Sequence, residues 1–240
     1  NPKAALVVLA KHGLLTWGET AQECYNQTIK ILQEAESFIA AHRGDRKIFP
    51  GLDIPPVAED ECHHVLQGIM PPLRGTLSTR QPAILEYDKA QDVLDFVGTA
   101  EANQLSQLGV ACPDHLVHTK RQPLFVNWKP EEGIDALNQK LKVELEAYVS
   151  RYQEYFTTFA QPTDKMFDPY PRVILIPGIG MINAGADALL ANVSGQLYHR
   201  AIRVIEGSLT FGGFEALKPD EVFKVEYWPL EIYKLSLKPP

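Results

Sequence analysis

The chain has 240 residues, of which 45% are hydrophobic and 22% charged, and its formal net charge is −7. This composition is ordinary for a globular protein with one large domain or two modest ones. The negative charge argues against nucleic acid or an anionic membrane surface as partner, and no apolar run approaches the roughly 18 residues of a membrane span.

Hydrophobic periodicity predicts helices that alternate with short strands. In chain order, the pattern predicts a strand at 4–10, helices at 18–42 and 57–73, a strand at 83–87, a helix at 88–98, a strand at 124–128, a long helix at 131–159 and a strand–loop–helix unit at 172–206. The second helix is expected to stop at Pro71-Pro72, and residues 45–56 are the best candidate domain boundary. Short strands between helices favour a layered α/β fold.

A segment near the start recurs near the end, with a histidine in the first copy only. Residues 5–18 align without gaps with residues 172–185, and in this alignment His12 meets Ile179 while Gly13 meets Gly180. Both copies are predicted to form a strand, a glycine-bounded loop and a helix, so the chain contains two related units. Only the first copy has a side chain that could serve metal or acid–base chemistry at this position.

The densest cluster of reactive side chains lies between Cys112 and Arg121. Three interpretations remain open for it. Cys112, His115 and His118 could face one metal with Asp114 as a fourth ligand, although Pro113 opposes one continuous helix through them. Alternatively, His115, Lys120 and Arg121 could hold a sugar phosphate or a carboxylate. The cluster could also be a solvated loop without a ligand.

Three further segments have a functional and a structural interpretation. The glycines Gly178 and Gly180 precede a helix and could present N–H groups to an anion, but their spacing does not fit a dinucleotide fingerprint, and a structural turn is favoured. The Cys62-His63-His64 run is predicted to be an exposed helix start. The tyrosines Tyr148, Tyr152 and Tyr155 recur at helical spacing, which is typical of a core or an inter-domain contact.

The ends of the chain and its cysteines indicate whether it is a fragment and in which cellular compartment it lies. The chain starts almost directly in an apolar strand and ends in a double-proline tail, so we expect an internal fragment of a longer polypeptide. The three cysteines (Cys24, Cys62 and Cys112) are odd in number and widely spaced, which suits the reducing cytoplasm.

Several motifs together resemble a known family. The segment 11–20 closely resembles the C-terminal part of class II (zinc-dependent) aldolase/adducin domains, and the whole chain is similar to bifunctional rhamnulose-phosphate aldolase/short-chain dehydrogenases. The motifs that carry this wider resemblance are residues 111–115, 119–120, 123–125, 176–181 and 226–231.

The resemblance implies a three-layer α/β/α aldolase-like fold with a mixed sheet. Residues 1–50 would be the C-terminal part of a truncated class II aldolase domain, and residues 57–240 a second, degenerate copy that precedes an absent dehydrogenase domain. In this family the histidine of the motif is the last of three zinc-binding histidines, so His12 is expected to bind zinc in the intact protein. The other two ligands and the acidic base cannot be matched in this chain, so no catalytic residue is assigned.

Two functions follow from the resemblance. The intact protein would cleave a phosphorylated ketose such as rhamnulose 1-phosphate with zinc, and a dehydrogenase domain with NAD would then oxidise the aldehyde product. The alternative is a non-catalytic aldolase-like spacer and oligomerisation module, which predicts a homo-oligomer without bound metal. The fragment alone is expected to be inactive as an aldolase.

Overall fold

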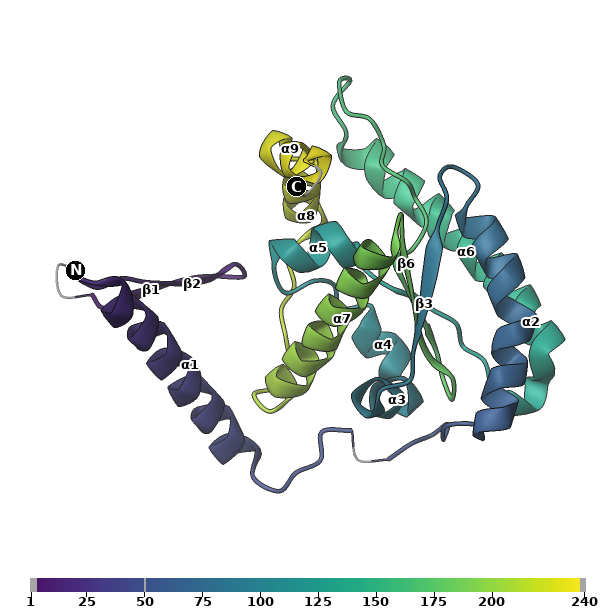
Figure 1. The fold of residues 1–240 in the computed structure, drawn as a ribbon, viewed down its shortest axis with the longest axis horizontal. Coiled ribbons are helices and arrows are strands. Elements are labelled where there is room, and N and C mark those ends of the chain that lie inside the picture. Colours follow the sequence, from purple (N-terminus) through teal and green to yellow (C-terminus); the bar gives the residue numbers. More distant parts are fainter. Residues whose placement is uncertain (1–3, 50, 238–240) are drawn as a thin grey trace.

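The computed structural model describes residues 4–49 and 51–237, and its main body is built on a four-stranded mixed sheet (Figure 1). The strand order is β3-β6-β5-β4. Strand β6 pairs antiparallel with both β3 and β5, while β4 runs parallel to β5. The bounds are β3 (Ile84–Asp88), β4 (Leu124–Phe125), β5 (Val173–Ile176) and β6 (Gly180–Gly185).

Alternate side chains of the central strands enter two separate cores. Ile174 and Ile176 face the helices α2 (Glu59–Leu77) and α6 (Gly133–Phe159), whereas Val173 and Leu175 face α3 (Gln91–Gly98) and α7 (Ala188–Leu209). All four strand residues are fully buried, as expected for a strand covered on both sides. The expected three-layer α/β/α fold with a mixed sheet is therefore confirmed (Figure 1).

The remaining helices of the main body are short. They are α4 (Ala102–Ser106), α5 (Pro113–Thr119), the 3-10 turn η1 (Pro130–Glu132), α8 (Pro219–Glu226) and α9 (Pro229–Ser236). A third apolar cluster joins α5, α8 and the C-terminal half of α6, and it includes Tyr227, the residue after α8. Among residues 4–49 and 51–237, no helix is long and apolar enough to cross a membrane.

Residues 4–43 extend away from this body (Figure 1). Strands β1 (Leu6–Leu9) and β2 (Gly13–Thr16) form an antiparallel hairpin, and α1 (Ala21–Arg43), which starts with a capping box at Thr20, contains no buried residue. The helix touches the body near the end of α7, where Phe38 stacks on Phe211 and Arg43 pairs with Glu206 at 3.2 Å.

The internal repeat predicted from the sequence is present element by element. With the offset of 167, the bounds of β1 fall on those of β5, β2 begins where β6 begins, and α1 begins where α7 begins. The turns also agree. Lys11 and Gly178 both have a positive φ (56° and 75°), and the N–H groups of His12 and Ile179 each donate to the last residue of the preceding strand at 3.1 Å. In both copies the left-handed residue is the third residue of a hydrogen-bonded four-residue turn, which is the pattern of a type II turn.

Two expectations about local structure are wrong. The segments 13–16 and 180–185 are not loops but strands, because each pairs back on the preceding strand across the tight turn. The helix α2 does not stop at Pro71-Pro72 but continues to Leu77, with Ile69, Leu73 and Leu77 buried on one face. Burial of that face outweighs the backbone hydrogen bonds that the prolines remove.

Candidate functional site

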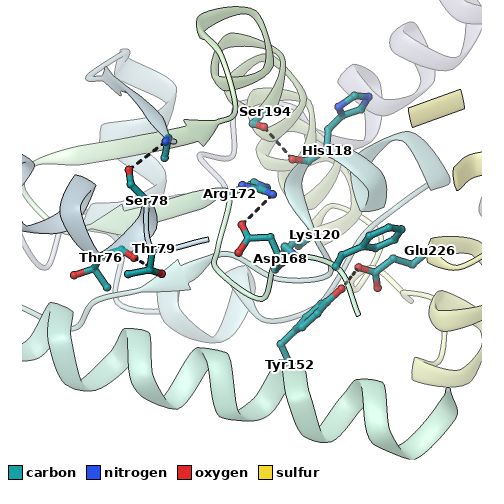
Figure 2. Close-up of polar contacts among 12 residues, drawn as sticks. Thr76, Ser78, Thr79, His118, Lys120, Tyr152, Asp168, Arg172, Ser194 and Glu226 are labelled. Atoms are coloured by element: carbon teal, nitrogen blue, oxygen red, sulfur yellow. Dashed lines mark hydrogen bonds and ion pairs between the residues drawn. The ribbon is translucent and has the colours of Figure 1, made fainter. Parts of the chain in front are cut away.

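A cavity of about 320 Å³ lies where the end of β6 and the start of α7 meet the segment 117–120. Charged side chains of both signs line it: Lys120, Asp168, Arg172 and Glu226 (Figure 2). They come from segments far apart in the sequence, namely the residue after α5, the loop before β5 and the last residue of α8. The fold therefore brings an ionisable cluster to one end of the sheet.

Lys120 is held in an unusual backbone conformation inside this cluster. It is a non-glycine residue with a φ of 61° and only 5% of its surface is exposed. Its Nζ donates to the carbonyl oxygen of Asp168 at 2.5 Å and lies 3.9 Å from the centroid of the Tyr152 ring. Burial lowers the pKa of Lys120 to about 8, although the nearby carboxylates of Glu226 and Asp168 oppose this shift.

Glu226 is the buried carboxylate at the other side of Lys120. It is 4% exposed and accepts hydrogen bonds from the hydroxyls of Tyr152 at 2.7 Å and Tyr155 at 3.0 Å. Burial and the Glu226 charge together raise the pKa of both tyrosines, so the hydroxyls stay protonated and remain donors. The predicted tyrosine stripe thus lies in the core, which is one of the two places expected for it. Two of its tyrosines also hold the Glu226 carboxylate.

Asp168 has one satisfied and one unsatisfied carboxylate oxygen. Its Oδ2 lies 3.2 Å from the Nη2 of Arg172 (Figure 2), while its Oδ1 is buried and has no hydrogen-bond partner among the described residues. A buried acceptor without a donor is costly, and such atoms in native structures call for an explanation.

We expect the buried Lys120 to make stability rise with pH above pH 8. The folded-state pKa of about 8 is below the value near 10.4 of an unfolded lysine, so the unfolded chain binds more protons between these values. The free energy of unfolding of the wild type should therefore rise relative to that of Lys120→Met by up to about 1.4 kcal/mol per pH unit in this window. Urea unfolding of both proteins from pH 8 to 10 measures the difference, and parallel pH profiles would contradict the expectation.

The structure separates residues that the sequence placed in one anion site. Lys120 and His118 both line the cavity, whereas the guanidinium of Arg121 lies 5.8 Å from the ring centroid of Tyr155, on another surface. His115 is buried within α5, and the carbonyl of His118, also on α5, accepts from the hydroxyl of Ser194 at 2.9 Å (Figure 2). The side chain of Asp114 lies outside the described part of the chain.

The predicted metal cluster around Cys112 is not supported. Pro113 starts α5 instead of interrupting it, so Cys112 is the residue before the helix while His115 and His118 are one turn apart within it. In the part of the chain that the structure describes, no group of three or more His, Cys, Asp or Glu side chains could hold a metal ion.

The glycines of the second repeat have structural roles. Gly178 is the left-handed residue of the turn between β5 and β6, and Gly180 begins β6, where an added Cβ would lie 2.5 Å from the carbonyl oxygen of Asp88. Gly185, at the opposite end of β6, lines the cavity instead. The segments 112–121 and 177–185 therefore meet at the cavity through Lys120 and Gly185, whereas Gly178 and Gly180 do not line it.

His12 occupies the turn between β1 and β2 and is exposed. Its counterpart Ile179 is 1% exposed and packs in the core beside α2 and α6. The two copies thus share one turn geometry but present opposite side chains, one polar and open to solvent and the other apolar and enclosed.

Sequence patterns missed two polar arrangements. The spacing of Asp168, Arg172 and Glu226 in the sequence matches no motif. Tertiary packing brings these three side chains together. His199 on α7 lies 2.7 Å from Asp92 and 2.8 Å from Asp88, and although burial lowers its pKa, the two carboxylates raise it above the usual value.

In the Cys62-His63-His64 run, the histidines are exposed as expected, but Cys62 is buried and contacts the hydroxyl of Tyr87 at 3.0 Å.

Comparisons with known proteins cover most of the chain. Residues 64–235 match the family model described as the second domain of class II aldolases. The chain is 49% identical over 241 residues to the "Uncharacterized oxidoreductase YuxG" of Bacillus subtilis (strain 168), and the match covers 100% of this chain and 35% of that protein. The chain therefore spans about a third of the length of this curated relative. No solved structure matches the chain.

Proposed function

The chain belongs to the family of class II aldolase second domains, and on this premise we propose that it is part of a longer polypeptide that joins a class II aldolase to a dehydrogenase. The name of the Bacillus subtilis relative, an oxidoreductase about three times as long as the matched segment, supports the second activity. Following the resemblance of residues 11–20 and 226–231, the proposed reaction is cleavage of rhamnulose 1-phosphate or a related ketose phosphate, followed by NAD-dependent oxidation of the aldehyde.

The contrast between His12 and Ile179 is the observation that carries this proposal. Both residues follow the left-handed residue of the same four-residue turn, yet only the first copy presents an imidazole to solvent. In the second copy, Ile179 is enclosed, and its carbonyl accepts from the Tyr87 hydroxyl at 2.8 Å. We assign a chemical role to the first copy and a scaffold role to residues 64–235.

The described residues do not form a zinc site on their own. A catalytic zinc ion takes three protein ligands, and among residues 4–49 and 51–237 no group of three His, Cys, Asp or Glu side chains could hold a metal ion at His12 or elsewhere. The expected role of His12 as a zinc ligand therefore requires partners from outside this part of the chain, and we derive no catalytic step from the residues present. The fragment by itself would not cleave the sugar phosphate.

An assembly role for the first 49 residues is the second candidate function. Val8 is 69% exposed, whereas its counterpart Leu175 in β5 is completely buried by neighbouring strands and helices. Tyr25 and Leu15 are also large exposed apolar residues of this unit. Val7 pairs with Leu15 and Val8 with Leu14, so large apolar side chains lie on both faces of the hairpin. Exposed apolar residues of this kind are typical of an interface, so this unit would pack against another segment of the longer polypeptide or a second copy of the chain.

Replacing His12 tests the aldolase proposal. In the longer polypeptide, His12→Ala should lower the rate of ketose phosphate cleavage by more than tenfold (about 1.4 kcal/mol or more of activation free energy) and leave aldehyde oxidation unchanged. Separate assays of the two reactions measure the effect. The matched control is His63→Ala, which removes an exposed imidazole from α2 and should leave both rates unchanged. Cleavage at the wild-type rate by the His12 variant would disprove the role of this residue.

A further inference from the structure

We propose that the cavity between β6, α7 and the segment 117–120 is a binding site for a small, neutral, polyhydroxylated molecule, such as a sugar or a polyol. The proposal concerns residues of the second copy and does not depend on the aldolase reaction. It rests on a buried acceptor without a donor, on the balance of charges in the cavity and on the mixture of polar and apolar walls.

The unpartnered Oδ1 of Asp168 indicates a donor on the ligand. This atom is buried, while the other oxygen of the same carboxylate is engaged by Arg172 at 3.2 Å. Leaving a buried carboxylate oxygen without a donor costs on the order of 1–3 kcal/mol. A small rotation of the Asp168 carboxylate, which lines the cavity, would turn this oxygen toward a ligand hydroxyl and recover that cost. Sugar hydroxyls donate to one atom and accept from another, so Arg172 on the same wall is a suitable second contact.

The charges of the cavity balance within the protein. Arg172 is paired with Asp168, and Lys120 lies near the carboxylate of Glu226, so two cations face two carboxylates. An added phosphate would approach both carboxylates in a partly buried place, where like charges repel strongly. This arrangement favours a neutral ligand over the sugar phosphate that the sequence suggested for Lys120.

The size and the walls of the cavity suit a molecule of this class. Its volume of about 320 Å³ is at the lower end of the range of small-molecule pockets. Phe167 and Leu190 supply apolar surface for C–H groups, and Gln81 adds an amide that can donate and accept. The hydroxyl of Ser194 already bonds the carbonyls of His118 and Leu190, so it is not counted as a ligand contact.

Titration of the purified chain with named probes tests the proposal. The probes are D-ribose, xylitol and D-mannitol as neutral polyhydroxylated molecules and inorganic phosphate as the anion, and binding is followed by saturation-transfer NMR and calorimetry. We expect at least one neutral probe to bind with a dissociation constant in the millimolar range or below, and phosphate not to bind in the cavity. Binding of phosphate alone, or of none of the four probes, would overturn the proposal.

Variants connect the binding to the cavity. Asp168→Ala removes the buried acceptor and should weaken the neutral probe at least tenfold, whereas Asp164→Ala, which removes a carboxylate of the same loop outside the cavity, should not. Ala186→Phe places a large side chain at the exposed rim without touching the charged pairs, and it should also abolish binding. Unchanged affinity in Ala186→Phe would place the binding elsewhere, even if Asp168→Ala fails to fold.

Discussion

Replacing Glu226 with alanine should lower the free energy of unfolding by about 3–5 kcal/mol, the range for breaking a buried charge network by removing one partner. Glu226 is 4% exposed and accepts the hydroxyls of Tyr152 and Tyr155 at 2.7 and 3.0 Å. Without it, two buried hydroxyls lose their acceptor and the buried ammonium of Lys120 loses a nearby opposite charge. Chemical denaturation of the purified chain measures the loss.

Two further variants in α8 serve as controls for this prediction. Asp220→Ala removes an exposed carboxylate that pairs with Lys224 on the same helix, and it should leave the free energy of unfolding almost unchanged because solvent screens the pair. Glu226→Gln keeps an acceptor for the tyrosine hydroxyls, so its loss in free energy of unfolding should lie between those of Asp220→Ala and Glu226→Ala. A loss below 1 kcal/mol in Glu226→Ala would show that the tyrosine hydroxyls and Lys120 find other partners and that this network does not stabilise the fold.

Replacing Gly180 with alanine should destabilise the chain by about 3 kcal/mol or more. Gly180 has a φ of 128°, which L-residues rarely adopt, and an added Cβ would lie 2.5 Å from the carbonyl oxygen of Asp88. The obstacle is backbone of the neighbouring strand, so β3 and β6 would have to separate at a point where they pair. The thermal or urea midpoint of Gly180→Ala measures the effect.

Gly75→Ala is the matched control for this substitution. Gly75 lies inside α2, and nothing is found within 4 Å of an added Cβ. Alanine is the better helix former there, so this variant should gain about 0.5–1 kcal/mol. If Gly180→Ala were as stable as the wild type, β6 would not begin in the observed register.

The parts of the fold that follow from local patterns could be predicted from the sequence. The buried stripe of α6 and the short apolar strands β3 and β5 lie close to where the sequence pattern places them. The repeat predicts the first strand and the helix of each copy, because apolar and glycine positions recur at a constant offset. The layered architecture then follows from helices that alternate with buried strands.

The remaining errors have physical causes. The strands β2 and β6 were expected as loops because glycines at their starts resemble a loop signal, whereas pairing across the turn decides the outcome. The two prolines predict an end of α2 that is too early, because the local sequence does not show that Leu73 and Leu77 are buried. In the candidate site, Lys120 was anticipated, but Asp168 and Glu226 meet it through tertiary packing, which no local spacing encodes.

Zinc content, measured by elemental analysis, tests most directly whether His12 binds zinc together with ligands from outside this chain. The comparison needs the chain alone, the longer polypeptide and its His12→Ala variant, all purified without a metal-affinity tag. Stoichiometric zinc in the longer polypeptide, lost in the variant and missing from the chain alone, is the predicted result. Stoichiometric zinc in the chain alone, or in the His12→Ala polypeptide, would contradict the assignment of His12 and the division of roles between the two copies.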